Sequence, residues 1–344
     1  MNLVQLKPRR ILIRSTNWIG DAVMTTPVVR TIRRNFPKAF IAILANPWVA
    51  DVFRSSPHVD EVILFDKKKE HQGLAGLFRL GRQLRALHFD AAILLQNAFE
   101  AAFLARISGI PIRAGYSRDG RRLLLTHPVV IKPEVRRRHQ VHYYQELCRS
   151  LGLEPGPDQL FLQLDPEQES RAAELVAGYC GRPLIGLNPG AAYGPAKCWP
   201  VERYGELAAV LALEYNAVMP VFGTEADRAT AAIIKGYAPG HVLDLTGRTS
   251  LAEAMALIGA CQLFITNDSG LMHVAAALDT PLVAIFGSTD PVATGPFAER
   301  VRIVRKAMDC QPCFKTHCKS GFRCMNEITV TEVSSAAKDI LTGA

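Results

Sequence analysis

The stretch "LFITNDSGLMHVAAALDTPLVAIFG" occupies residues 263–287, and its pattern decides the fold that we predict for this chain. The apolar run LFIT indicates a buried strand, and a polar turn follows it at residues 267–270. The alanine-rich segment 271–279 is typical of a helix, and a second apolar run, PLVAIFG, begins at residue 281. A strand, a helix and a second strand in this order indicate two parallel strands joined by a helical crossover.

The same alternation extends over the whole chain in two series, which are separated by the polar segment 164–170. Helical patterns such as 21–36 and 73–88 lie between the apolar runs, and the tail after residue 327 is predicted as a final helix. The predicted strands are 10–14, 39–45, 61–65 and 90–96, then 183–190, 217–223, 241–245, 261–268 and 281–287. We therefore predict an α/β protein with two Rossmann-like, doubly wound parallel-sheet domains. Ligands of such sheets bind beyond the carboxyl ends of the strands, so we expect a central cleft where the two domains face each other.

Composition and charge narrow the possible functions of the chain. Hydrophobic residues make up 49% of the 344 residues, which is enough to form cores and argues against disorder. No apolar run approaches the roughly 20 residues of a membrane span, and the first one, ILI, ends at Arg14, too early for a signal peptide. Residues 1–150 carry 25 basic and 11 acidic side chains, a net charge of +14, whereas the remainder carries −6. We expect a cytoplasmic protein whose first half meets an anionic partner, with a merely soluble basic face as the alternative.

The polar turn of the opening stretch is the strongest candidate binding site. Ser269 and Gly270 are predicted to begin a helix, so their N–H groups can bind a phosphate without a metal ion. Asp268 could anchor a sugar hydroxyl or order the loop, and His273 lies one turn further along the same helix. A single histidine there would usually be structural, but four polar groups at one strand end favour a site.

Asp21 follows the first predicted strand, within the segment "STNWIGDAVMTTP" (15–27). We expect Gly20 to permit a tight turn and Asp21 to lie at or near a helix N-terminus. There the carboxylate either caps exposed N–H groups or acts as a base at the edge of the cleft. The second role requires partial desolvation to raise its pKa, and both readings remain open.

Lys197 and Glu225 follow two strands of the second series. Lys197 lies in the segment "NPGAAYGPAKCWP" (188–200), where glycines let the backbone approach a ligand, so it could bind a phosphate. Glu225 could accept hydrogen bonds from ribose hydroxyls. Each residue also has a structural alternative without a role in binding. Lys197 could be a solvated loop lysine, and Glu225 could be a helix cap. The chain contains neither a G-x-G dinucleotide fingerprint nor a P-loop, so a diphosphate would be bound by Lys197 and backbone amides.

Four of the eight cysteines fall within fifteen residues, in the pattern C-x2-C-x4-C-x5-C. This spacing is compatible with a zinc knuckle or an iron–sulfur site, and reduced thiols or an adventitious disulfide are the alternatives. These four are Cys310, Cys313, Cys318 and Cys324. The others are separate in sequence and are expected to be buried or incidental: Cys148, Cys180, Cys198 and Cys261.

Three segments resemble, in the same order, the ADP-heptose–lipopolysaccharide heptosyltransferases of glycosyltransferase family 9. They are "ILIRSTNWIGDAVMTTPVVRTIRRNFP" (11–37), "NPGAAYGPAKCWP" (188–200) and "NDSGLMHVAAALDTPLVAIFGSTDP" (267–291). The second segment is most similar to the heptosyltransferase II branch of the family. The resemblance implies a GT-B architecture, with an acceptor-binding domain at 1–164 and a donor-binding domain at 165–327. It leaves open whether the helical segment 328–344 packs back on the first domain.

The resemblance also implies an activity, which is inverting, metal-independent transfer of L-glycero-D-manno-heptose from ADP-heptose to a heptosyl–Kdo–lipid A core. Carried over by motif position, Asp21 resembles the general base and Lys197 the lysine that contacts the diphosphate. Glu225 resembles the acid at the ADP ribose. The donor phosphate and sugar loop corresponds to Asp268, Ser269, Gly270 and His273.

The partners implied are ADP-heptose, a Kdo- and heptose-bearing lipid A acceptor and the anionic inner face of the inner membrane, with no cofactor and no nucleic acid. Basic clusters that could contact the acceptor, or could simply be solvated, are Lys67, Lys68, Lys69, Arg136, Arg137 and Arg138. Other members of the family carry similar cysteines without an established metal role, so we expect no metal and keep a metal site as the alternative. A different GT-B enzyme, such as an epimerase or another core heptosyltransferase, and a basic nucleic-acid-binding protein with a cysteine knuckle are the competing readings.

Overall fold

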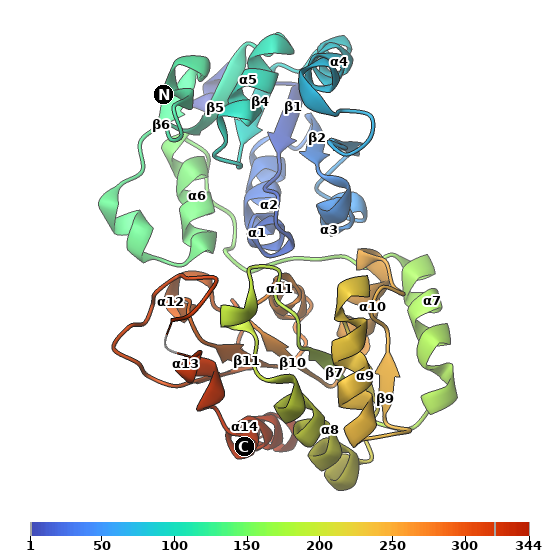
Figure 1. The fold of residues 1–344 in the computed structure, drawn as a ribbon. Helices are drawn as coiled ribbons and strands as arrows, with labels where there is room; N and C mark the ends of the chain where they lie inside the picture. Colours follow the sequence, from blue (N-terminus) through green and yellow to red (C-terminus); the bar gives the residue numbers. More distant parts are fainter. Residues whose placement is uncertain (1, 320, 344) are drawn as a thin grey trace. The chain divides into compact units, whose positions relative to one another are not determined.

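A computed structural model describes residues 2–319 and 321–343, which form two compact units, Met1–Gln163 and Leu164–Ala344 (Figure 1). Each unit contains one six-stranded sheet in which every strand pair is parallel. The predicted α/β class is therefore confirmed, and both sheets are doubly wound. Within the described residues no helix combines the length and the apolar character that crossing a membrane requires.

The sheet of the first unit has the strand order β3-β2-β1-β4-β5-β6. Leu12 of β1 packs in one core cluster with Leu80 and Leu104, so α4 and α5 cover that face of the sheet. Side chains alternate along a strand, and Ile11 and Ile13 are therefore buried on the opposite face. The strands are β1 (Arg10–Arg14), β2 (Phe40–Ala45), β3 (Glu61–Leu64), β4 (Ala91–Leu94), β5 (Ile112–Tyr116) and β6 (His127–Val129). The helices are α1 (Ile19–Met24), α2 (Thr26–Asn35), α3 (Asp51–Arg54), α4 (Gly73–Ala86), α5 (Phe99–Ile107) and α6 (Gln140–Ser150).

The second unit repeats this design with the order β12-β11-β10-β7-β8-β9. Apolar side chains of β7, β10 and β11 form its core with residues from α8, α9 and α14. The strands are β7 (Ile185–Asn188), β8 (Met219–Val221), β9 (Val242–Asp244), β10 (Leu263–Asn267), β11 (Leu282–Phe286) and β12 (Val301–Arg305). The helices are α7 (Pro166–Val176), α8 (Val201–Tyr215), α9 (Arg228–Tyr237), α10 (Leu251–Ala260), α11 (Gly270–Ala277), α12 (Pro291–Thr294), α13 (Arg323–Asn326) and α14 (Val330–Thr342).

The structure differs from the sequence interpretation in several elements. The predicted helix 21–36 is two helices, because Pro27 lies in the first turn of α2, where its missing N–H is tolerated. Gly20 lies inside α1 and not in a tight turn. Three strands were not predicted: β5 contains Arg and Gly, β6 has three residues, and β12 is an exposed edge strand.

The last helix, α14, belongs to the second unit. Val333, Ala336 and Ala337 lie in the core cluster of that unit, and α14 packs against α8, β10, β11 and β12 (Figure 1). The helix begins with a capping box in which Thr329 and Glu332 exchange hydrogen bonds. The sequence leaves open whether this segment packs on the first domain, and the structure places it in the core of the second unit.

Candidate functional site

The second unit has its topological switch point between β7 and β10, where the strand order reverses direction. Asn188 is the last residue of β7 and Asn267 the last residue of β10, and both are buried. The loops that follow these two strands carry Lys197 and Asp268. The fold therefore gathers residues from distant parts of the sequence at the edge of the sheet where ligands of such folds bind.

Asp268 is the centre of this arrangement. Its carboxylate is only 5% exposed, and its Oδ2 atom accepts hydrogen bonds from Lys197 Nζ and Thr289 Oγ1, each at 2.5 Å. Lys197 lies at the end of the short helix η6 (Pro195–Lys197), and Thr289 follows β11. A buried ion pair of this kind holds both groups in place, although its desolvation offsets much of the charge attraction. Lys197 and Asp268 were both predicted as site residues, and the structure brings them together.

The start of α11 lies beside Asp268 and has an unusual N-cap. Ser269 is the N-cap residue of α11, yet its side chain makes no capping hydrogen bond. Its Oγ instead accepts a hydrogen bond from Asn188 Nδ2 at 2.7 Å and lies 3.1 Å from Thr266 Oγ1. The first-turn N–H groups, beginning at Gly270, thus lack the usual side-chain acceptor and can bind an anion with the helix dipole behind them.

Asn267 is a positioning residue that the sequence analysis did not single out. Its Nδ2 donates to Pro189 O at 2.6 Å, and its Oδ1 accepts from the Trp199 backbone N–H and the Tyr204 hydroxyl, both at 3.2 Å. One buried amide therefore ties the end of β10 to the loop that carries Lys197. The signal in the sequence was an Asn at the end of an apolar strand, a position where a buried polar group needs partners.

The two remaining residues predicted for a donor site, His273 and Glu225, lie in different environments. His273 lies on α11, one turn after Gly270, and is 4% exposed. Glu225 begins the short helix η7 (Glu225–Asp227) after β8, and its exposed carboxylate pairs with Arg228 at 3.0 Å. It does not take part in the Asp268 network, and its contact with a ribose stays a prediction.

In the first unit, Asp21 lies in the first turn of α1, as predicted from the sequence. Its Oδ1 accepts a hydrogen bond from the Tyr144 hydroxyl of α6 at 3.3 Å. Burial and the neighbouring Asp21 carboxylate raise the pKa of Tyr144 well above its usual value, so this hydroxyl keeps its proton. Tyr144 was not predicted as a site residue.

Two buried arginines form hydrogen bonds at strand ends of the first unit, and neither was predicted. Arg14, at the end of β1, donates to Ser15 O at 2.8 Å and to Asn17 Oδ1 at 3.0 Å. Arg121 donates to Tyr116 O at 2.8 Å and to Asn97 Oδ1 at 3.0 Å, after β4. Burial lowers the pKa of each guanidinium to about 10, so both remain charged near neutral pH.

The basic clusters do not converge in the way that Lys197, Asp268 and Thr289 do. Lys67 pairs with Glu100 at 2.6 Å, Lys68 lies 5.9 Å from the Trp48 ring, and Lys69 is exposed. The second cluster, Arg136, Arg137 and Arg138, is exposed at the end of the short helix η4 (Pro133–Arg137). Their role toward an acceptor stays a prediction.

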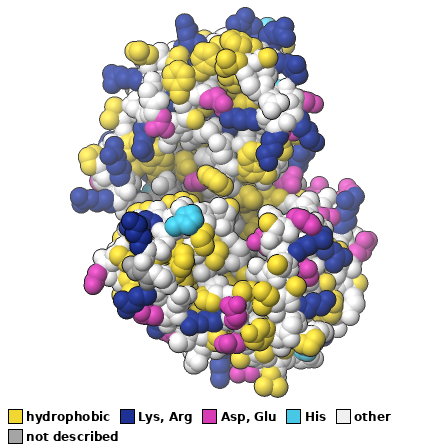
Figure 2. All heavy atoms as spheres, in the orientation of Figure 1, with side chains coloured by type: hydrophobic (Ala, Val, Ile, Leu, Met, Phe, Trp, Pro, Cys, Tyr) yellow, Lys and Arg dark blue, Asp and Glu magenta, His cyan; other side chains and the backbone are white. Residues whose placement is uncertain are grey.

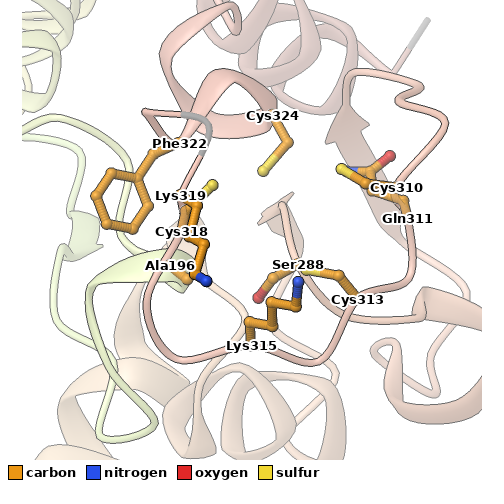
Figure 3. Close-up of a pocket in the computed structure, with 10 residues that line it drawn as sticks. All are labelled: Ala196, Ser288, Cys310, Gln311, Cys313, Lys315, Cys318, Lys319, Phe322 and Cys324. Atoms are coloured by element: carbon orange, nitrogen blue, oxygen red, sulfur yellow. The ribbon is translucent and has the colours of Figure 1, made fainter.

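The four clustered cysteines line one pocket in the second unit, with Lys315 and Lys319 among the other residues that line it (Figure 3). None of these four cysteines is joined to another described residue by a disulfide bond. Within residues 2–319 and 321–343, no three Cys, His, Asp or Glu side chains are close enough together to bind one metal ion without movement.

Comparison with known proteins gives consistent results. A sequence model of the family described as Glycosyltransferase family 9 (heptosyltransferase) matches residues 77–322. Lipopolysaccharide heptosyltransferase 2 of Salmonella typhimurium is 34% identical over 308 residues, which cover 86% of this chain and 88% of that protein. The solved structure of E. coli ADP-heptose LPS heptosyltransferase II has a TM-score of 0.84 and 30% identity, covering 97% and 99% of the two chains. A family 9 glycosyltransferase from Veillonella parvula has a TM-score of 0.89 and 26% identity, covering 98% of both.

Proposed function

The chain belongs to glycosyltransferase family 9 and is a heptosyltransferase with a GT-B fold, and from that premise we propose that it transfers L-glycero-D-manno-heptose from ADP-heptose to the heptosyl–Kdo–lipid A inner core of lipopolysaccharide. The observation that carries the proposal is the network of Lys197, Asp268 and Ser269 at the uncapped start of α11. It offers an ammonium group and backbone N–H groups where a nucleoside diphosphate would bind. The 34% identity to a lipopolysaccharide heptosyltransferase 2 favours the heptosyltransferase II branch of the family.

In the proposed reaction, Asp21 accepts the proton of the acceptor hydroxyl as its oxygen forms a bond to the anomeric carbon of heptose. The bond from that carbon to the phosphate oxygen breaks, and ADP leaves with the electron pair. Attack from the face opposite the leaving group inverts the configuration. Lys197 and the N–H groups of α11 stabilise the charge that develops on ADP, so the step needs no metal ion.

The proposal assigns the acceptor to residues 1–164 and the donor to residues 165–327. On the donor side, Asp268 holds Lys197 in place before ADP-heptose arrives, and the ammonium group then turns toward the diphosphate. His273 donates to an anionic oxygen, and Glu225 accepts from the ribose hydroxyls after leaving Arg228. On the acceptor side, the Arg136–Arg138 cluster and the Lys67–Lys69 cluster contact the Kdo carboxylates and the phosphates of lipid A.

We further propose that the first unit binds the anionic cytoplasmic face of the inner membrane. Its residues 1–150 carry a net charge of +14, and Figure 2 shows basic side chains beside exposed hydrophobic ones at the top of the view. Leu74 and Phe78 of α4 are 73% and 51% exposed, and Phe99 of α5 is 51% exposed. Arg79 and Arg82 are exposed on the same helix α4. Apolar and basic side chains together are typical of an interfacial membrane contact.

A transfer assay tests the enzymatic proposal most directly. Purified protein is incubated with ADP-heptose and lipid A acceptors that carry Kdo alone, Kdo with one heptose, or a longer core. We expect transfer only to the acceptor with one heptose, while preference for Kdo alone or for a longer core would assign another core heptosyltransferase. ADP should raise the melting temperature while UDP and oligonucleotides should not, because only a ligand of the folded state stabilises it. Absence of any transfer would contradict the proposal.

A vesicle assay tests the membrane contact separately. We expect co-sedimentation with vesicles that contain anionic lipid, and loss of it in 0.5 M salt, where screening is strong. The variant Leu74→Ser/Phe78→Ser should bind these vesicles more weakly, whereas Leu213→Ser, an equally apolar and 88% exposed position on α8, should not change binding. Equal loss in both variants would contradict the assignment to α4.

A further inference from the structure

The cysteine loop, residues 306–322 between β12 and α13, stands apart from the rest of the second unit. Its described residues form no helix and no strand, whereas most connections in a compact domain are much shorter, about four to six residues. Three of the clustered cysteines lie in this loop, and Cys324 follows in α13. Because this segment has no helical or strand hydrogen bonding, it needs other contacts to hold one conformation.

The four sulfur atoms face a shared space. Figure 3 shows the cysteine side chains arranged around the pocket, which they line together with Ser288 and Phe322. Cys148 and Cys261 differ, because they are fully buried and pack as small apolar side chains.

We propose that Cys310, Cys313, Cys318 and Cys324 bind one thiophilic divalent ion, zinc or iron(II), as a structural tetrathiolate site. Four cysteines with a C-x2-C pair are a typical ligand set for such ions, with metal–sulfur bonds of about 2.3 Å. The sulfurs lie around the pocket and not yet at that distance, so the ion draws the loop inward as it binds. Each thiol loses its proton on binding.

The charges that line the pocket fit this proposal. A divalent ion with four thiolate ligands carries a net charge of about minus two, which is costly to hold in a partly buried position. Lys315 and Lys319 line the same pocket and supply two positive charges. Figure 3 shows both lysines beside the thiols. This pairing distinguishes the site from four cysteines that merely share a loop.

The cysteine loop is also attached to the donor site. Phe314 O accepts from the Tyr193 hydroxyl at 2.6 Å, and Thr316 O accepts from the Ala196 N–H at 3.2 Å. The N–H groups of Cys313 and Phe314 donate to Ser288 O at 3.0 and 2.9 Å, next to Thr289. The ion would therefore fix the two loops that carry Lys197 and Thr289, the partners of Asp268. It has no part in the reaction itself.

Metal analysis of the purified protein tests the site. The full chain is prepared in reducing buffer without chelators, and zinc, iron and acid-labile sulfide are measured. We expect zinc or iron equimolar with the chain and no acid-labile sulfide. The Cys310→Ser/Cys313→Ser variant should lose the metal, and Cys180→Ser, which changes an exposed cysteine outside the cluster, should keep it. Metal-free protein that also takes up no added Zn²⁺, a disulfide among the four, an iron–sulfur cluster, or metal retained by the double variant would each overturn the proposal.

A second measurement uses the unaltered chain, so it does not depend on the variant folding. We expect a chelator to lower the melting temperature and Zn²⁺ to restore it. Metal removal should also weaken ADP binding about tenfold, an effect of the size that supporting interactions around a site have. An unchanged melting temperature after complete metal removal would overturn the structural role. The proposed heptosyl transfer is tested separately by the acceptor assay, so either proposal can fail alone.

Discussion

The residues of the second unit that we propose as the donor site and the basic clusters of the first unit were predicted from different kinds of signal. Asp268, Ser269 and Lys197 were predicted because they follow strands, and the structure joins Asp268 to Lys197 and Ser269 to Asn188. The basic clusters were predicted from charge alone. Their side chains contact different parts of the first unit and do not meet at one site. Parallel topology brings strand ends together whatever the loops contain, whereas a run of like charges carries no information about where its side chains meet.

The comparison also separates two kinds of electrostatic effect. The Lys197–Asp268 pair is nearly buried, with side-chain exposures of 13% and 5%, so removing one partner leaves an uncompensated charge. The Arg136–Arg138 cluster is exposed, and water and salt weaken whatever it does. We therefore expect variants at the strand ends to change activity by orders of magnitude and variants in the clusters to change it only a few-fold.

Asp21→Asn is expected to have the largest effect. Loss of a general base lowers turnover by about 10²- to 10⁴-fold, and ADP affinity should not change because the proposal places Asp21 on the acceptor side. The measurement is kcat with saturating ADP-heptose, together with ADP titration. Asp51→Asn is the matched control, since Asp51 is also an acid in the first turn of a short helix of this unit. Near-normal turnover of Asp21→Asn would remove this residue from the base role.

Lys197→Ala comes next, because it removes the cation that we propose stabilises the leaving group and also leaves Asp268 buried without its ion-pair partner. Turnover should fall about 10²-fold, ADP should bind more weakly, and the free energy of unfolding should fall by ~3 kcal/mol. The double variant Lys197→Ala/Asp268→Asn should recover part of the stability and none of the turnover. Urea unfolding and steady-state kinetics measure the two effects, with Lys235→Ala on the exposed face of α9 as control. Unchanged donor binding and turnover would make Lys197 a spectator.

The sequence predicted the strand-end residues but not the groups that hold them. Asn267, Tyr144 and Arg121 lie far in sequence from their partners, and Arg121 reaches Asn97 only because β4 and β5 are adjacent. Such contacts depend on packing between elements, which periodicity does not specify. The same limit applies to the fold. The nine strands with apolar runs were predicted, but β12, with Arg302 and Arg305 on an exposed edge, lacks the burial that gives a strand its hydrophobic pattern.

Tyr144→Phe sharpens the comparison, because it tests a packing contact that the sequence did not reveal. The Tyr144 hydroxyl stays protonated, since burial and Asp21 raise its pKa, and it donates to the Asp21 carboxylate. Removing this donor destabilises the charged form of Asp21, so the pKa of Asp21 should rise and the acid limb of the kcat profile should move to higher pH. Turnover at pH 8 should fall less than tenfold, because the bond is long at 3.3 Å and a neutral hydrogen-bond donor contributes modestly.

The kcat profile between pH 5 and 9 is the measurement for Tyr144→Phe. Tyr179→Phe is the control, because Tyr179 lies in the second unit beside Arg182. A merely structural role for Tyr144 would lower turnover equally at all pH values and would leave the acid limb where it is in the unaltered chain.

The smallest effect is expected from the triple variant Arg136→Gln/Arg137→Gln/Arg138→Gln. If this cluster attracts the acid groups of the acceptor, its loss should raise the acceptor KM a few-fold at low salt, with kcat and the donor KM unchanged. The difference should vanish in 0.5 M salt, where the Debye length is only a few ångströms. The control neutralises three exposed cations of the second unit, Arg171, Lys235 and Lys338. A change of more than tenfold in the acceptor KM, or a difference that persists in high salt, would mean that the cluster forms a preorganised binding site like that around Asp268. The contrast between the two regions would then be wrong.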